Sequence, residues 1–137
     1  MKIGRILLAT VAVLVLHALF MLVTCCGIFS WVYKLQPTNV WKPMYGPPGA
    51  SFYIGQFIFM LLFVLVYVLL KAGLPGKNVM VKGAVYGLCI WAVGVLPGMA
   101  ATYALMNIAP GVVLYWTIQA LVLLPLKGLA AAAICGN

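Results

Sequence analysis

The side chains that could take part in chemistry are few, and the acidic ones are missing altogether. The 137 residues include eight Lys and Arg, one His, four Cys and no Asp or Glu. Catalysis by paired carboxylates is therefore excluded, and so are the buried Asp and Glu on which proton relays and cation sites in membranes usually depend. Mg²⁺ and Ca²⁺ also lose their preferred side-chain oxygen ligands. We therefore expect a protein that is not an enzyme and has no metal site.

His17 is the only histidine, and it lies near the middle of a long apolar run. As a neutral imidazole it could hydrogen-bond to a neighbouring helix, or it could ligate haem. One histidine provides one axial ligand per chain, so a bis-histidine haem would need a symmetric partner or a second ligand such as methionine. We expect no cofactor, with haem at His17 as the alternative. An absent Soret band would exclude haem.

The cysteines do not have the spacing of a zinc site, and no Cys-x-x-Cys occurs. Cys25 and Cys26 are adjacent and fall near one end of an apolar run, where a disulfide could form. The favoured role of all four thiols is that of small apolar filler. Gln56 and Gln119 are amides in or near apolar runs, and we expect them to hydrogen-bond between helices.

The composition shows which elements must hold these side chains. Hydrophobic residues make up 67% of the chain and charged residues 6%, whereas soluble domains are about 45–50% apolar and about 25% charged. About 20 apolar residues cross a bilayer as a helix. Continuous apolar runs of that length predict a single transmembrane domain over 1–137, an all-α integral membrane four-helix bundle. The predicted spans are 6–32, 52–70, 83–106 and 111–134.

The positive charges predict the orientation of these spans. With four spans, both termini lie on one side of the membrane. That side would carry five cations, namely Lys2, Arg5, Lys71, Lys77 and Lys82. The other side would carry two, Lys34 and Lys42, and Lys127 lies inside the fourth span. Because cytoplasmic loops are enriched in Lys and Arg, we expect both termini in the cytoplasm.

The external loop between the first two spans is rich in proline and aromatic residues. Four prolines between residues 33 and 51 prevent helix formation and favour extended or turn geometry. Aromatic rings collect where one edge meets water and the rest meets lipid. We expect a rigid cap on the membrane surface that includes Trp31, Trp41 and Pro43. A plain interfacial belt is favoured over a lid above a ligand.

Small residues recur on one face of the third and fourth spans. Gly83, Gly87, Gly94 and Gly98 follow one helical face in steps of four or seven, and Gly128 and Ala132 repeat the four-residue spacing in the fourth span. Small residues let helix backbones approach closely in lipid. We therefore expect a tight antiparallel pair joined by a short turn at 107–110. Packing within the chain is favoured, and dimerisation is the alternative.

The cations have no acidic side chain to pair with inside one copy. Lys127 lies in the fourth span and could extend its stem to the headgroups, or it could pair with an acidic residue of another subunit. Lys71, Lys77 and Lys82 are expected to contact anionic lipid or an acidic partner. Nucleic acid is not an expected partner, because the charges sit at membrane boundaries rather than on one soluble face.

Two stretches resemble known families. Residues 82–123 contain Lys-Gly-x3-Gly-Leu-x2-Trp, Leu-Pro-Gly and Trp-Thr-Ile-Gln-Ala-Leu, and resemble small four-span bacterial integral membrane proteins of unknown function. That resemblance implies a compact helical bundle in the bacterial inner membrane and no particular activity. The loop over 31–43, Trp-Val-Tyr-Lys-Leu-Gln-Pro followed by Trp-Lys-Pro, is similar to a loop of the tryptophan-rich sensory protein (translocator protein) family. That family is implied to bind porphyrins and sterols between five helices.

Two functions follow from these features. The favoured one is a non-catalytic accessory subunit of a multi-subunit inner-membrane complex, or a homo-oligomer, that packs through its small-residue faces. The alternative is a membrane protein that binds a hydrophobic or tetrapyrrole ligand under the proline-rich cap.

Overall fold

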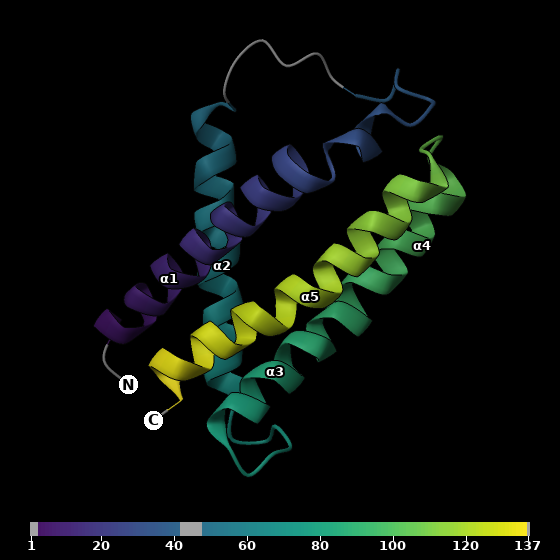
Figure 1. Cartoon of the computed structure of the whole chain (residues 1–137). Helices are drawn as coiled ribbons and strands as arrows, with labels where there is room; N and C mark the ends of the chain where they lie inside the picture. Colours follow the sequence, from purple (N-terminus) through teal and green to yellow (C-terminus); the bar gives the residue numbers. More distant parts are fainter. Residues whose placement is uncertain (1–2, 42–47, 137) are drawn as a thin grey trace.

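The computed structural model describes residues 3–41 and 48–136 (Figure 1). Four segments of 21 to 27 residues are long and apolar enough to cross a membrane: Ile3–Ile28, Ala50–Leu70, Val79–Leu105 and Pro110–Cys135. The described part of the chain is helical and contains no strand. The predicted all-helical protein with four membrane-length helices is therefore confirmed. Pro43 and the cations Lys2 and Lys42 fall outside the described residues.

The first span ends earlier than predicted. It consists of α1 (Ile3–Met21) and a π-helical segment, η1 (Leu22–Ile28). At Phe29 the backbone leaves helical geometry, with φ −110° and ψ 21°, and a short 3₁₀ helix, η2 (Ser30–Lys34), follows. The turn at Phe29 directs Val32 into a small core, where it is 3% exposed. Hydropathy alone does not reveal this bend, because both sides of it are apolar.

The third span begins earlier than predicted and contains a break. It starts at Val79 because the side chain of Asn78 accepts a hydrogen bond from the Met80 amide at 2.9 Å, which caps α3 (Val79–Ile90). A π-helical segment, η3 (Trp91–Val95), separates α3 from α4 (Leu96–Leu105). Pro97 lies in the first turn of α4, where its missing amide hydrogen costs least.

The tight pair of helices is α3 and α5 (Pro110–Cys135), which lie side by side in Figure 1. A Cβ at Gly83 would collide with the backbone of Gly128, and one at Gly87 would collide with the backbone at Leu124 and Pro125. Gly128 in turn faces the Gly83 carbonyl. Ala132 is buried beside Gly83. These four residues, for which a packing role is predicted, lie where α3 and α5 approach each other within the chain.

The same prediction is wrong within the chain for Gly94 and Gly98. A Cβ at either glycine would meet nothing within 4 Å, and α4 has no buried residue. The cause is η3, because a π-helical turn holds an extra residue and rotates everything after it by about 100°. The glycines before η3 face α5, whereas Gly94 within η3 and Gly98 after it do not.

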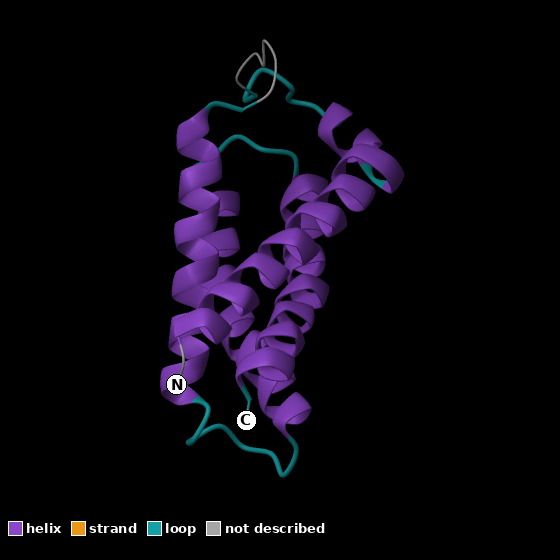
Figure 2. Ribbon diagram, turned by 90° about the vertical axis from the view of Figure 1, so that its left-hand side faces the viewer, coloured by secondary structure: helices purple, strands orange, loops and turns teal. Residues whose placement is uncertain are grey.

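The buried residues form two clusters at opposite ends of α5. The larger includes Ala9, Val13, Val64, Tyr67, Tyr86 and Cys135, and the smaller consists of Val32, Ala109 and Val112. Helix α2 (Ala50–Leu70) joins only the larger cluster, since its buried residues are Met60, Val64 and Tyr67 in its second half. Its first half stands apart from α4 and α5 (Figure 1), and Figure 2 shows only helices and loops in the described residues. The middle of α5 therefore lacks α2 as a neighbour and contacts α3, η1 and η3 instead.

Candidate functional site

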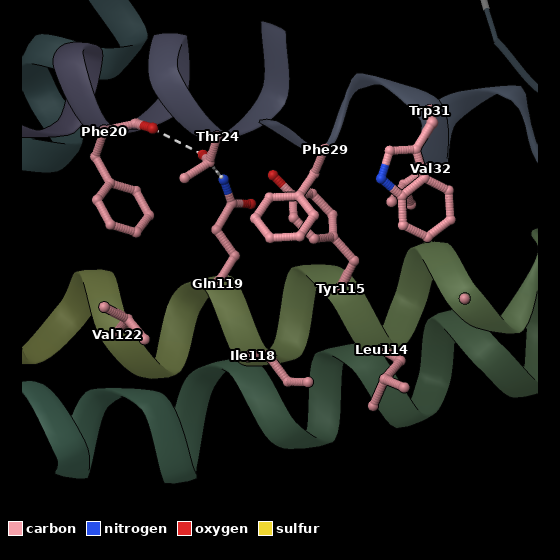
Figure 3. A pocket seen from close by; sticks show the side chains of 11 residues that line it. Phe20, Thr24, Phe29, Trp31, Val32, Leu114, Tyr115, Ile118, Gln119 and Val122 are labelled. Atoms are coloured by element: carbon pink, nitrogen blue, oxygen red, sulfur yellow. Dashed lines mark hydrogen bonds between the residues drawn. The ribbon is translucent and has the colours of Figure 1, made fainter. Parts of the chain in front are cut away.

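A polar junction joins the end of α1 and the following η1 to the middle of α5. The Gln119 amide nitrogen donates to Thr24 Oγ1 at 2.6 Å and lies 3.3 Å from the sulfur atoms of Met21 and Cys25. Thr24 donates onward to the Phe20 carbonyl at 2.7 Å (Figure 3). Gln119 is 8% exposed. The interhelical bond predicted for Gln119 is confirmed, and it fixes the separation of α1 and α5 between two cavities.

A cluster of aromatic hydroxyls surrounds the thiol of Cys25. Tyr33 donates to Cys25 Sγ at 3.4 Å, Tyr115 Oη lies 3.5 Å from the same sulfur, and the Trp116 indole donates to Tyr33 Oη at 3.1 Å. Burial raises the pKa of Tyr33, so its phenol stays protonated and remains a donor. The prediction that all four cysteines are apolar filler is wrong for Cys25, because its sulfur belongs to this hydrogen-bonded cluster.

The other cysteines lie apart from this cluster. All four are free thiols, with Cys135 buried and Cys26 and Cys89 exposed. Cys135 lies 3.6 Å from the Arg5 carbonyl. Within the described residues, no group of three or more His, Cys, Asp or Glu side chains comes together as a metal site would require.

The predicted aromatic cap is divided between two roles. Trp41 packs on the smaller core cluster, with its ring centroid 5.5 Å from that of Tyr33 and 5.9 Å from that of Trp116. Its indole nitrogen is buried and has no hydrogen-bond partner in the described part of the chain. Trp31 is exposed and stands at the edge of a groove. Pro43, predicted with them, is outside the described residues.

That groove runs between the α1–η2 segment and α5, and its volume is about 450 Å³ (Figure 3). Rings of Phe20, Phe29 and Tyr115 form its walls together with aliphatic side chains of α5. The polar groups of Thr24, Tyr115 and Gln119 lie along its base. The full lining is Phe20, Thr24, Phe29, Trp31, Val32, Gly111, Leu114, Tyr115, Ile118, Gln119 and Val122.

A second cavity, of about 310 Å³, lies on the other side of the Gln119 junction. It is lined by α1, η3, α4 and α5 through His17, Met21, Val95, Met99, Trp116, Gln119, Ala120, Leu123, Leu124 and Lys127. Lys127 is 5% exposed, so the snorkelling interpretation is wrong for this arrangement. Its side chain lies inside the bundle rather than along the lipid-facing surface. The sequence did not indicate that His17 and Lys127 would share a cavity.

The remaining predicted cations gather where α5 ends. Lys71 Nζ donates to the Cys135 carbonyl at 2.6 Å and lies 3.4 Å from the Gly136 carbonyl. Lys82 Nζ donates to the Lys71 carbonyl at 3.1 Å. Lysine at a helix C-terminus satisfies free carbonyls and complements the helix dipole. Lys71 therefore has a structural role within the chain, whereas a lipid or partner contact for Lys77 and Lys82 stays a prediction.

Comparison with protein-family models, with curated proteins and with solved structures finds no match to this chain. The two resemblances noted in the sequence therefore stay predictions. The function has to be argued from the groove, the cavity and the packing faces.

Proposed function

We propose that this chain is a multi-pass protein of the bacterial inner membrane that binds a hydrophobic ligand in the groove between α1–η2 and α5. The observation that carries the proposal is the groove itself, with a volume of about 450 Å³. Binding sites for small molecules are concave, have volumes of about 300–1,000 Å³, and combine apolar walls with a few polar groups. The groove has each of these properties.

The arrangement of the groove favours a flat or ring-containing molecule with one polar end. The rings of Phe29 and Tyr115 are 5.2 Å apart at their centroids and present an aromatic wall. The Gln119 and Tyr115 side chains are already held by hydrogen bonds to Thr24 and Cys25. Their positions are therefore set before a ligand enters, which lowers the entropic cost of binding.

Mass spectrometry of the protein purified in mild detergent tests this proposal. We expect a discrete apolar species bound in excess over bulk phospholipid. Ile118→Trp should displace it, because Ile118 lines the groove and is 53% exposed. Leu121→Trp is the matched control, since Leu121 lies on the same helix, is also exposed, and does not line the groove. Finding bulk phospholipid alone, or equal loss in both variants, would contradict the proposal.

A second candidate function, that of a non-catalytic accessory subunit, is supported by the outward face of η3 and α4. Gly94 and Gly98 leave open space beside the backbone, and no residue of α4 is buried. Such a face can receive a helix of another membrane protein or of a second copy. Gly98→Leu should then abolish migration of the protein above its own mass in native gels while leaving its thermal stability unchanged. A stable isolated monomer from native membranes would argue against this function.

The cytoplasmic location of both termini also belongs to the proposal. Helix α1 begins and α5 ends at the same end of the molecule, where the turn after α2 carries Lys71 and Lys77 (Figure 1). Lys34 is the cation of the opposite end within the described residues. The charge difference supports this orientation through the positive-inside rule.

A further inference from the structure

We propose that the cavity lined by His17 and Lys127 binds the carboxylate of an amphiphile with one slender apolar chain, as in a free fatty acid. This site is independent of the groove proposed above. The two share Gln119 as their one common lining residue. Gln119 is hydrogen-bonded to Thr24 of η1 at that point and forms part of the wall of both.

The unbalanced charge of Lys127 is the first argument. The chain contains no Asp or Glu, and no hydrogen bond or ion pair in the described residues reaches the ammonium group of Lys127, which is 95% buried. A buried ion without a partner is strongly unfavourable, and ionisable residues inside membranes are paired or line a functional path. A counter-charge for the protonated ammonium has to come from another molecule, and a carboxylate supplies one negative charge for one positive charge.

His17 provides the second argument. Its Nδ1 atom is buried and has no hydrogen-bond partner in the part of the chain that the structure describes. A neutral imidazole can donate one N–H and accept at its other nitrogen. A carboxylate has two oxygens, so one can accept from the Lys127 ammonium while the other accepts from His17. Two otherwise unsatisfied polar groups on different helices would then be satisfied by one ligand group.

The remaining walls indicate the rest of the ligand. They are apolar and partly flexible, with Met21, Val95, Met99 and Leu123 among them, and methionine adapts well to irregular apolar shapes. A helix is about 10–12 Å across with its side chains, which is too wide for a cavity of about 310 Å³. A single acyl chain fits such a space. An acidic side chain reaching in from another subunit is therefore less favoured, and the experiment below distinguishes it.

Equilibrium binding of radiolabelled oleate and methyl oleate tests the proposal directly. The full-length, delipidated protein is placed in phosphatidylcholine nanodiscs. The two probes share one acyl chain, and methyl oleate carries an uncharged methyl ester in place of the carboxylate. We expect oleate to bind about 10- to 100-fold more tightly, the range of one charge-assisted hydrogen-bond pair. Lys127→Met should abolish this preference and His17→Leu should reduce it. Lys34→Met removes the same charge from an exposed position and should retain the preference.

Two further measurements keep the result independent of folding and of the groove. Lys127→Arg keeps the charge and should keep the preference for oleate, which a merely misfolded variant would not. Ile118→Trp should leave the preference unchanged even where it reduces total binding, so that failure of the groove and failure of this site are distinguishable. Equal affinity for both probes, or a preference that persists in Lys127→Met, overturns the proposal. So does photocrosslinking from Met99 in native membranes that captures a membrane protein and no lipid.

Discussion

The close approach of α3 and α5 at Gly87 allows a sharp test of what holds the bundle together. The test compares Gly87→Ala with Gly98→Ala, which adds the same methyl group further along the same span. At Gly87 the new Cβ would collide with backbone atoms of Leu124 and Pro125. Backbone cannot rotate away as a side chain can, so α3 has to move away from α5. At Gly98 the new Cβ would meet nothing within 4 Å.

The two substitutions are expected to change the free energy of unfolding in opposite directions relative to the parent. Overpacking a close contact costs about 1–3 kcal/mol, and the separation of α3 from α5 also weakens the neighbouring contact between Gly83 and Gly128. Alanine gains up to about 1 kcal/mol over glycine in a helix interior. Gly87→Ala should therefore lose a net of about 1–2 kcal/mol. Gly98→Ala should keep or gain up to about 1 kcal/mol, because nothing opposes the gain.

Thermal unfolding in one detergent, followed by circular dichroism, measures both variants beside the parent. For a chain of this length, 1 kcal/mol corresponds to roughly 4 °C in the midpoint. We expect Gly87→Ala to unfold roughly 4–8 °C below the parent and Gly98→Ala to unfold at or above it. Equal midpoints for the two variants, or a greater loss in Gly98→Ala, would show that the register change at η3 is not as described.

Three other outcomes are expected. Lys71→Met should lower the free energy of unfolding by about 1 kcal/mol in a denaturant titration, because it removes the donor to the Cys135 carbonyl; Lys77→Met should change it little. Lys127→Met should raise the unfolding midpoint of the delipidated protein, because it removes an unpaired buried charge that destabilises the fold by about 1–3 kcal/mol. A lower midpoint would show that the ammonium is already paired. A reporter fused after Asn137 should read out as cytoplasmic, and an external reading would reverse the proposed orientation.

The four helices could be predicted from the sequence because their signal needs only composition and length. The contact of Gly83 and Gly87 with Gly128 could also be predicted, since an α-helix has a regular period. The extension of that face to Gly94 and Gly98 failed because η3 interrupts the period. A π-helical turn has no clear sequence pattern here, although Pro97 two residues after it removes a backbone donor and favours a local break.

The candidate site was harder to predict from the sequence than the helices were. Gln119 could be identified as a polar residue between helices, but the contact of Tyr33 with Cys25 depends on the bend at Phe29, which lies between them in the chain. His17 and Lys127 are 110 positions apart. Their meeting in one cavity depends on the crossing of α1 and α5 and on the absence of α2 from that level. Neither feature can be predicted from the local periodicity of the sequence.

The burial of Lys127 is unusual because the chain has no acidic side chain to pair with it. In most proteins a buried lysine is explained by an Asp or Glu elsewhere in the chain, and nothing further follows from it. Here no such residue exists, so the ligand proposed for this cavity is the source of a counter-charge that the chain lacks. The same cavity leaves His17 Nδ1 without a partner in the described residues. Two such polar groups facing one small apolar space favour a ligand that carries both a negative charge and an apolar chain, because such a ligand matches the polar groups and the apolar walls together.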